Sequence, residues 1–427
     1  MRRLVPILLV GAAVFSIALS LVQAQDAPPA VLTLKGYAVL PADTFTDGPA
    51  SGAKIDPSQN LNGRTIPFKS QPVQGISAIL PVGNGNYYVM SDNGYGAKGN
   101  SADFMLRFDE VKVDFSTGKV EVVGFTGLSD PDKKIPFPIV NNDTPDRLLT
   151  GADFDIESFR QLADGTFWFG EELGPFLLHT DKTGKVLEAP IPTPYPDVLA
   201  KFTRSLKFIE SPDNPEFVSL ADADARKAAA NLPSSKGFEG MALNSAGDKL
   251  YPLMEGPLVD DTDRNHLLIQ EFDLKSTAYT GKFWFYPMSA PGNSIGDMTA
   301  INENEYLVIE RDNGQGLDAA FKRIYKIDLS KVGDDGHTVS KTLVADLMGI
   351  YDAKGLTKPE KGAVGLGPVF KFPFVTIESV YPVDADTLIV VNDNNYPFSS
   401  GRRPGIAADD NEFILLSLPE ALNLTSK

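Results

Sequence analysis

Asp155-Ile156-Glu157-Ser158-Phe159, followed by the turn Asp164-Gly165 and the run that ends at Gly170-Glu171-Glu172, is the stretch that decides the fold. It holds a short apolar run that carries an acid near its start, a turn, a second apolar run and a second acid. Short runs rich in aromatic and β-branched residues between Gly, Asp and Asn turns are typical of antiparallel strands. The stretch therefore predicts a β-hairpin with one acid near its first strand's start and another at its second strand's end.

The rest of the chain repeats this plan, and self-similarity of this kind indicates a repeat architecture. The corresponding first-strand phrases are Gly75-Ile76-Ser77, Asp155-Ile156-Glu157, Gly237-Phe238-Glu239, Ile295-Gly296-Asp297 and Thr376-Ile377-Glu378. A third apolar run follows each hairpin, and a fourth follows most of them. Four antiparallel strands per unit, repeated radially, predict an all-β fold of the β-propeller type.

The last unit lacks a fourth run of its own, whereas the apolar run Val31 to Leu40 precedes the first complete unit. We therefore predict five four-stranded blades, with the N-terminal strand closing the ring as the fourth strand of the last blade. A sixth, degenerate blade is the alternative. The long segments 129–150 and 189–235, the second with a helix-like Ala-rich stretch, are predicted to cap one face, where propellers bind their ligands.

The N-terminus has the pattern of an export signal. Arg2 and Arg3 precede the apolar run Leu4 to Leu21, and Val22-Gln23-Ala24 supplies a cleavage site. We predict a signal peptide over residues 1–24, a single propeller domain over residues 25–427 and a periplasmic or secreted location. A membrane anchor is the alternative interpretation of the run. The chain has no Cys, so a lipid anchor and disulfides are excluded.

The composition is that of a globular protein, with 42% hydrophobic residues, but the net charge is −17. Such a charge disfavours binding to nucleic acids and to anionic membranes, both of which need Lys and Arg to neutralise phosphate. It favours cations, or small anionic or ester substrates that a cation holds. The oligomeric state is not indicated by the sequence.

Antiparallel pairing places the start of a first strand beside the end of a second strand, so the recurring acids should meet at one mouth of the central channel. The predicted metal-ligating set is Glu157, Glu171, Glu239, Glu255, Asp297, Glu310, Glu378 and Asp393. Oxygen ligands of this kind suit a divalent cation, above all calcium. For any single acid, capping of a turn by accepting backbone N–H bonds is the alternative.

Crowded carboxylates and a cation could support hydrolysis without a covalent nucleophile, because a metal ion polarises the ester and activates water. We take Glu239, Glu378 and Glu157 as the candidate catalytic carboxylates, one of them a general base. Arg311, which directly follows Glu310, is the candidate group that steadies the leaving anion.

The phrases Asp155-Ile156-Glu157-Ser158, Gly237-Phe238-Glu239-Gly240-Met241-Ala242 and Thr376-Ile377-Glu378-Ser379-Val380, with Asn392-Asp393-Asn394-Asn395, resemble the exported bacterial phytase-like family, also described as having esterase-like activity of phytase. The resemblance covers nearly all of the chain after the signal. It implies a β-propeller, a hydrolase of phosphate or carboxylate esters and, by analogy with β-propeller phytases, calcium. The Asp-Asp-Pro-Ala type segment and the clustered Lys and Arg of those phytases are missing, which argues against phytate itself as the substrate.

Two alternatives stay open at this point. Gly292-Asn293-Ser294-Ile295-Gly296 matches the G-x-S-x-G nucleophile elbow, but that motif needs a strand before it and a helix after it. Here it runs into a predicted first strand, so we interpret it as a turn entering a strand. The other function class is a non-catalytic exported propeller that binds a ligand or another protein on its capped face.

Overall fold

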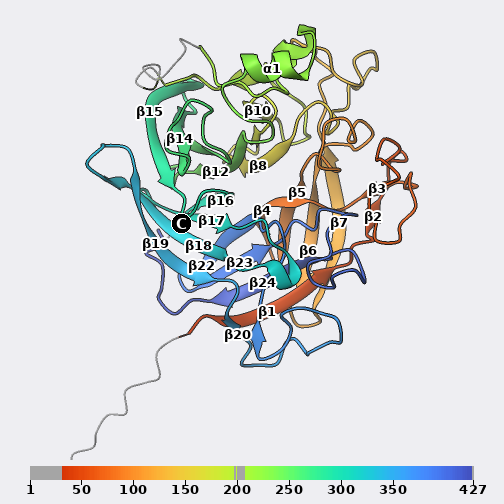
Figure 1. Cartoon of the computed structure of the whole chain (residues 1–427), viewed down its shortest axis with the longest axis vertical. Coiled ribbons are helices and arrows are strands. Elements are labelled where there is room, and N and C mark those ends of the chain that lie inside the picture. The colour runs from red at the N-terminus through yellow and green to blue at the C-terminus, as the bar shows by residue number, and fades with distance from the viewer. Residues whose placement is uncertain (1–30, 197–198, 200–206, 426–427) are drawn as a thin grey trace, which may run out of the picture.

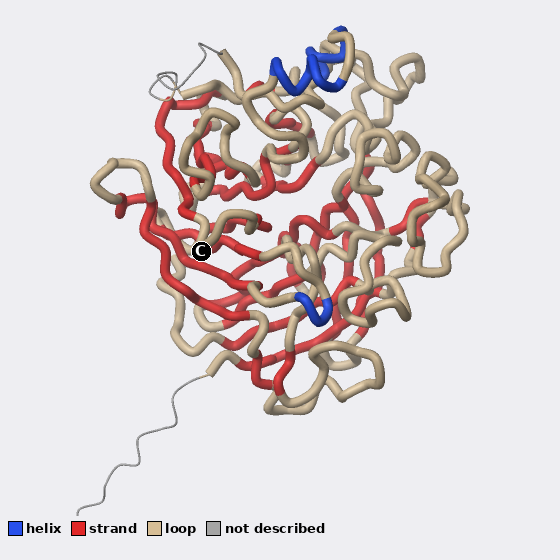
Figure 2. The backbone as a smooth tube through the Cα atoms, viewed as in Figure 1, coloured by secondary structure: helices blue, strands red, loops and turns tan. Residues whose placement is uncertain are grey.

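The computed structural model describes residues 31–425 apart from 197–198 and 200–206, and strands dominate it (Figures 1 and 2). The predicted signal peptide lies outside the described residues.

Four blades are consecutive four-stranded antiparallel units. Blade 1 has β4 (Ile76–Gly83), β5 (Asn86–Ser91), β6 (Arg107–Asp114) and β7 (Lys119–Gly127), and blade 2 has β8 (Ile156–Gln161), β9 (Phe167–Glu171), β10 (Phe176–Thr180) and β11 (Ile191–Pro192). Blade 3 has β12 (Phe238–Leu243), β13 (Lys249–Met254), β14 (His266–Asp273) and β15 (Ala278–Pro287), and blade 4 has β16 (Ser294–Ala300), β17 (Glu305–Arg311), β18 (Lys322–Val332) and β19 (Val339–Asp346).

Blade 5 is made from both ends of the chain. It consists of β22 (Ser379–Asp384), β23 (Thr387–Val391), β24 (Asn411–Ser417) and β1 (Thr33–Leu40). The N-terminal strand β1 pairs antiparallel with β24 from Thr33 opposite Ser417 to Leu40 opposite Asn411. The predicted ring closure and the five blades are thus confirmed, and the described residues contain no sixth four-stranded blade.

The first strand of each blade lies innermost. β4 contacts β8, β8 contacts β12, β12 contacts β16, β16 contacts β22, and β22 contacts β4, which closes the inner ring. At the periphery, β1 of blade 5 and β7 of blade 1 share one parallel pair, Val39 with Lys119. Because first strands start and second strands end at the same edge, one mouth of the ring collects residues from all five blades.

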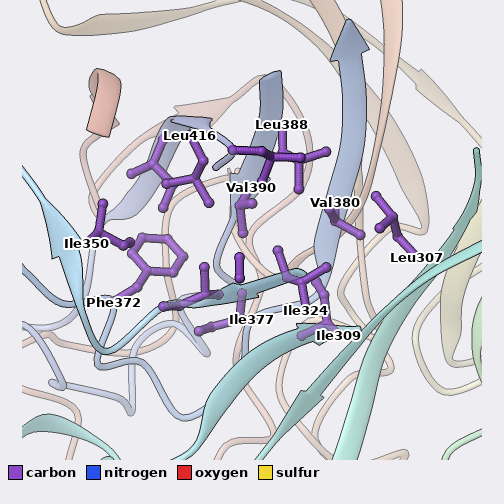
Figure 3. Packing of buried hydrophobic residues seen from close by; sticks show 14 of the residues in the cluster. Leu307, Ile309, Ile324, Ile350, Phe372, Ile377, Val380, Leu388, Val390 and Leu416 are labelled. Carbon is purple, nitrogen blue, oxygen red and sulfur yellow. The ribbon is translucent and has the colours of Figure 1, made fainter. Parts of the chain in front are cut away.

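Five hydrophobic clusters fill the spaces between neighbouring blades. Figure 3 shows the cluster between blades 4 and 5, where Leu307, Ile309 and Ile324 face Val380 and Leu388. Equivalent clusters lie between blades 1 and 2, 2 and 3, 3 and 4, and 5 and 1. Burying one such side chain stabilises the fold by about 1.5–3 kcal/mol, so the blades hold together without any disulfide.

Most of the remaining elements cover one face of the ring. Second and fourth strands both run toward the mouth at which the first strands begin. The loops from a second to a third strand and the connections from a fourth strand to the next blade therefore start at this mouth. They include the 3₁₀ helices η1 (Pro215–Ser219) and η2 (Gly316–Asp318), the helix α1 (Ala223–Ala229), and the short pair β2 (Phe45–Thr46) with β3 (Gln71–Pro72). The pair β20 (Ile350–Tyr351) with β21 (Val369–Phe370) lies instead at the outer edge of blade 5, where Tyr351 pairs with Thr33 of β1. A sixth cluster, which includes Phe68, Tyr95 and Tyr396, joins the 41–71 segment to two of these loops. Part of the 189–235 insertion is described, and its helix α1 lies at the edge of the molecule beside blades 2 and 3 (Figure 1), in the connection from β11 to β12.

Candidate functional site

Each blade presents two equivalent positions at the capped mouth of the ring. The first is the residue after the apolar residue of the first-strand phrase, and the second is the last residue of the blade's second strand or lies one or two residues beyond it. The first position holds Ser77, Glu157, Glu239, Gly296 and Glu378 in blades 1 to 5; the second holds Asp92, Glu172, Glu255, Arg311 and Asp393. All six positions in blades 2, 3 and 5 are carboxylates, whereas blade 1 supplies a serine and an aspartate and blade 4 a glycine and an arginine.

A β-bulge recurs at the first position. In blade 2, Ile156 pairs with Glu171 and Ser158 with Gly170, so Glu157 is the extra residue. The same irregularity falls at Ser77 and Glu239, and at Gly296 with Asp297. A bulge re-aims a side chain that would otherwise alternate to the other face of the sheet. The repeated bulge thus belongs to the construction of the mouth.

Carboxylate oxygens crowd together in two groups that share Glu172. Oxygens of Asp155, Glu157 and Glu172 lie within 4.8 Å of one another, and so do oxygens of Glu172, Glu239 and Glu255. All five residues are buried. Asp155 precedes β8 and is oriented by Asn93, whose backbone N and Nδ2 donate to its two oxygens over 3.2 and 2.6 Å. Buried carboxylates in this arrangement could hold a metal ion.

Two cations lie on one side of the cluster. Arg311 donates from Nη2 to Oε1 of Glu378 over 3.0 Å, and the same nitrogen lies 3.6 Å from Glu255 and 3.8 Å from Glu239. Lys236, from the connection before β12, donates to Oε2 of Glu255. Burial opposes the charge on Arg311, but these three carboxylates raise its pKa above the ordinary value.

The other carboxylates outnumber these cations, and their proton affinities rise accordingly. Burial, with neighbouring carboxylates adding to it, raises the pKa of Asp92, Glu157, Glu172 and Glu239 well above the ordinary range. The pKa values of Asp155 and Glu378 are raised by burial as well. Burial and the charge of Glu378 raise the pKa of Asp393 to about 7. Such a set holds protons or a bound cation near neutral pH.

The sequence prediction named Glu157, Glu239, Glu255, Glu378 and Asp393, and the structure brings these five together at the mouth. Arg311, predicted to steady the leaving anion, lies there too, and its guanidinium contacts the carboxylates of Glu239, Glu255 and Glu378. Its contacts are those of an internal counter-charge.

Three predicted ligands point elsewhere, and each is displaced by one position from the true repeat. Glu171 accepts N–H bonds from Leu173, Gly174 and Phe176, and burial raises its pKa to about 8. It therefore caps the turn after β9, and its neighbour Glu172 faces the mouth.

Asp297 and Glu310 show the same displacement in blade 4. Asp297 pairs with Arg160 over 2.9 Å, because Gly296 and not Asp297 occupies the position equivalent to Glu157. Glu310 accepts from Tyr286, Ser289, Asn293 and Lys341 and binds the outer part of blades 3 and 4 together. Side chains alternate along a strand, so a shift of one residue moves each to the opposite face.

Sequence reasoning left three residues of the cluster out of the ligand set: Asp92, Asp155 and Glu172. The signal was available for Glu172, because counting 15 residues on from the first position, or 16 in blade 3, gives Asp92, Glu172, Glu255, Arg311 and Asp393. Asp155 precedes its strand and has no equivalent acid in the other blades. No strand periodicity would have indicated it.

The G-x-S-x-G stretch is no nucleophile elbow. Ser294 begins β16, Asn293 donates to Glu310, and a strand follows where the motif requires a helix. The interpretation as a turn that enters a strand is correct.

Fold and site together define the class: a five-bladed propeller with a buried cluster of carboxylates at its capped mouth. A family model described as phytase-like, esterase-like activity of phytase, matches residues 71–396, and the chain belongs to this family. An uncharacterized secreted protein of Arthroderma benhamiae is 23% identical over 177 residues, which cover 37% of this chain and 34% of that protein. The match thus spans about a third of the curated relative's length.

Solved structures show only distant likeness. The exo-β-1,3-galactanase 1,3Gal43A of Clostridium thermocellum aligns over 90% of this chain and 65% of its own, with 11% identity and a TM-score of 0.43. The calcium-binding protein regucalcin of Agrobacterium tumefaciens aligns over 90% of this chain and 100% of its own, with 12% identity and a TM-score of 0.36. Among the described residues, no helix has the length and apolar character needed to cross a membrane.

Proposed function

We propose that this protein is an exported hydrolase of phosphate or carboxylate esters that works with a divalent cation, calcium in the first instance, at the carboxylate cluster. The proposal rests on the two sets of three crowded carboxylates that share Glu172. In these sets, Oε1 of Glu172 and Oε1 of Glu239 are buried without a hydrogen-bond partner. The family description supports ester hydrolysis, and the name of the Arthroderma relative supports export by the predicted signal at residues 1–24.

The donor set fits a hard cation, because it consists of carboxylate oxygens without any sulfur or imidazole. Asp155, Glu157 and Glu172 would hold the ion, with Glu239 and Glu255 beside it. A bound calcium ion would polarise the phosphoryl or acyl oxygen of an ester and lower the pKa of water.

The chain's own groups would supply the proton transfers. Burial and the charge of Glu378 raise the pKa of Glu239, and Glu378 itself accepts hydrogen bonds from Ser77 and Arg311. Oε1 of Glu239 has no hydrogen-bond partner, so it is our candidate to accept the proton of the attacking water. Arg311 would keep the cluster compact by balancing its charge.

The substrate would approach over the capping loops. A surface hollow of about 450 Å³ lies between the loop after β5, the loop after β23 and the 41–71 segment, all on the capped face. Its lining residues are Gln59, Asn60, Tyr95, Gly96, Ala97, Asn100 and Phe398. Amides and two aromatic rings, with no charged side chain, would suit the uncharged part of an ester.

Hydrolysis is tested with the purified full chain and p-nitrophenyl esters of phosphate and of short acyl groups, with calcium and with EDTA. We expect turnover that EDTA abolishes and calcium restores. The double variant Glu239→Gln, Glu378→Gln should lose it, whereas Glu171→Gln, which caps a turn beside the cluster, should keep it. Full activity of the double variant would remove the cluster from the mechanism.

A non-catalytic binding propeller is the second candidate, favoured by the burial of Asp155, Glu157, Glu172, Glu239 and Glu255 at the capped mouth. Under that reading the cation would be structural. Inactivity across the substrate panel, combined with calcium-dependent stability, would support it over the hydrolase.

A further inference from the structure

We propose that the cluster binds its divalent cation on the blade 2 side, between Asp155, Glu157 and Glu172, and that Arg311 of blade 4 takes the place of a second cation on the opposite side. The inference rests on the cation site of the proposed function and deepens it. It divides one crowded cluster into a metal-binding half and a half that the protein neutralises itself.

The blade 2 half has the donors of a cation site and no ion-paired counter-charge, since Lys236, whose charge acts on Glu172, is paired with Glu255. Within the described part of the chain, no Lys, Arg or His nitrogen lies within 4.0 Å of the carboxylates of Asp155, Glu157 or Glu172. Glu172 is 4% exposed, and its Oε1 has no hydrogen-bond partner. A buried carboxylate oxygen without a partner is costly, and a cation among these oxygens would remove that cost.

Asn93 fixes one ligand of this half. Its backbone N and its Nδ2 both donate to Asp155, so that carboxylate is held in one orientation from the neighbouring blade. A metal ligand is commonly oriented by such an outer hydrogen bond, which lowers the cost of assembling the site.

The opposite half already contains its positive charge. Nη2 of Arg311 lies 3.0, 3.6 and 3.8 Å from oxygens of Glu378, Glu255 and Glu239, and Lys236 binds the other oxygen of Glu255. One guanidinium nitrogen therefore contacts three carboxylates from two blades, as a small cation would. A divalent ion in this half would first have to displace it.

Blade 4 is built to deliver this arginine and no acid. At its first position stands Gly296, where an added Cβ would lie 2.1 Å from the carbonyl oxygen of Ile377 and 3.1 Å from Cα of Glu378. A carboxylate side chain therefore cannot be accommodated there, and the backbone of Glu378 approaches closely instead. At the second position Arg311 replaces the acid of the other four blades.

Calcium titration of the metal-free full chain by calorimetry tests this division, because it measures binding without any substrate. We expect one ion per chain for the natural sequence. Glu157→Gln should weaken binding about tenfold or more, because it removes a charged ligand. Glu378→Gln, on the arginine side, should change the affinity less than about threefold, and Glu171→Gln, whose carboxylate caps a turn, is the control outside the ligand set. Arg311→Met should bind two ions per chain.

Unchanged binding in Glu157→Gln, or a larger loss in Glu378→Gln than in Glu157→Gln, would overturn the inference even if Arg311→Met did not fold. A folded Arg311→Met that still bound one ion would also overturn it. One ion bound as expected by a protein without esterase or phosphatase turnover would uphold the inference and reject the hydrolase. Calcium-dependent turnover of the natural chain, combined with weaker calcium binding in Glu378→Gln than in Glu157→Gln, would uphold the hydrolase and reject the inference.

Discussion

Arg311, the last residue of β17, donates to Glu378, which precedes β22, over 3.0 Å, and this contact joins blades 4 and 5 at the capped mouth. Both side chains are at most 7% exposed. A second role follows from the neighbours of Arg311, because the same nitrogen also faces Glu239 and Glu255 of blade 3. A single cation thus links three consecutive blades.

Arg311→Met should therefore destabilise the metal-free protein by about 3–5 kcal/mol, since it leaves buried carboxylates without their counter-charge. Arg311→Lys should lose less, because a charge remains although the planar fork is gone. Urea unfolding in EDTA measures both. Equal stability of Arg311→Met and the natural chain would show that the carboxylates are neutral without the arginine.

The blades were predictable and the exact ligands were not, for a physical reason. Apolar runs and Gly or Asp turns are local properties, so four strands per unit and the closing strand from Val31 to Leu40 could be read from the sequence. Which of two adjacent residues faces the mouth depends on register, and the bulge at Glu157 shifts that register by one residue. In the doublet Glu171-Glu172, Glu171 ends β9 and Glu172 follows it, and the sequence does not show which of the two identical residues accepts the N–H bonds of the turn.

Closure of the ring by the N-terminal strand is testable at Leu34, which is fully buried between blades 4 and 5. Leu34→Ala should lower the free energy of unfolding by about 2–5 kcal/mol, the usual effect of truncating a buried leucine. Its neighbour Lys35 has a half-exposed side chain, so Lys35→Ala is the matched control and should change stability by less than about 1 kcal/mol. Similar unfolding midpoints for the two variants would contradict a structural role of β1.

The close approach at Gly296 gives a prediction about backbone packing. Gly296→Ala places a Cβ 2.1 Å from the carbonyl oxygen of Ile377, so blades 4 and 5 must separate at the mouth. We expect a loss of about 1–3 kcal/mol, the usual cost of overpacking. In Gly124→Ala an added Cβ would meet nothing within 4 Å, so this variant should unfold within about 0.5 kcal/mol of the natural chain. A neutral Gly296→Ala would mean that the inner strands adjust freely.

Asp409 should make stability depend on pH. It accepts N–H bonds from Gly401 and Arg402, and burial raises its pKa from 3.8 to about 7. Between these two values the folded state holds a proton that the unfolded state has released. The contribution of this group is therefore fully present below pH 3.8 and is lost as the pH rises towards 7.

Asp409→Asn removes this contribution, so the free energy of unfolding of the natural chain should fall relative to the variant by at most about 1.4 kcal/mol per pH unit between pH 4 and pH 7. Above pH 7 the difference should stay constant. Urea unfolding at each pH measures it, and Asp143→Asn, at an exposed carboxylate, is the control. A difference that grew in the opposite direction would mean that Asp409 is ionised in the folded protein.

Adjacent residues with opposite roles give the sharpest prediction for the cluster. In EDTA, Glu172→Gln should raise the free energy of unfolding, because it removes one of several like charges buried together. Glu171→Gln should lower it by about 1 kcal/mol, because an amide nitrogen replaces an oxygen that accepts a backbone N–H. Saturating calcium should then stabilise the Glu171→Gln protein as much as the natural chain and the Glu172→Gln protein much less, since a bound ligand stabilises only the state that binds it. Thermal unfolding with and without calcium separates the two effects, and the same calcium response in both variants would remove Glu172 from the cation site.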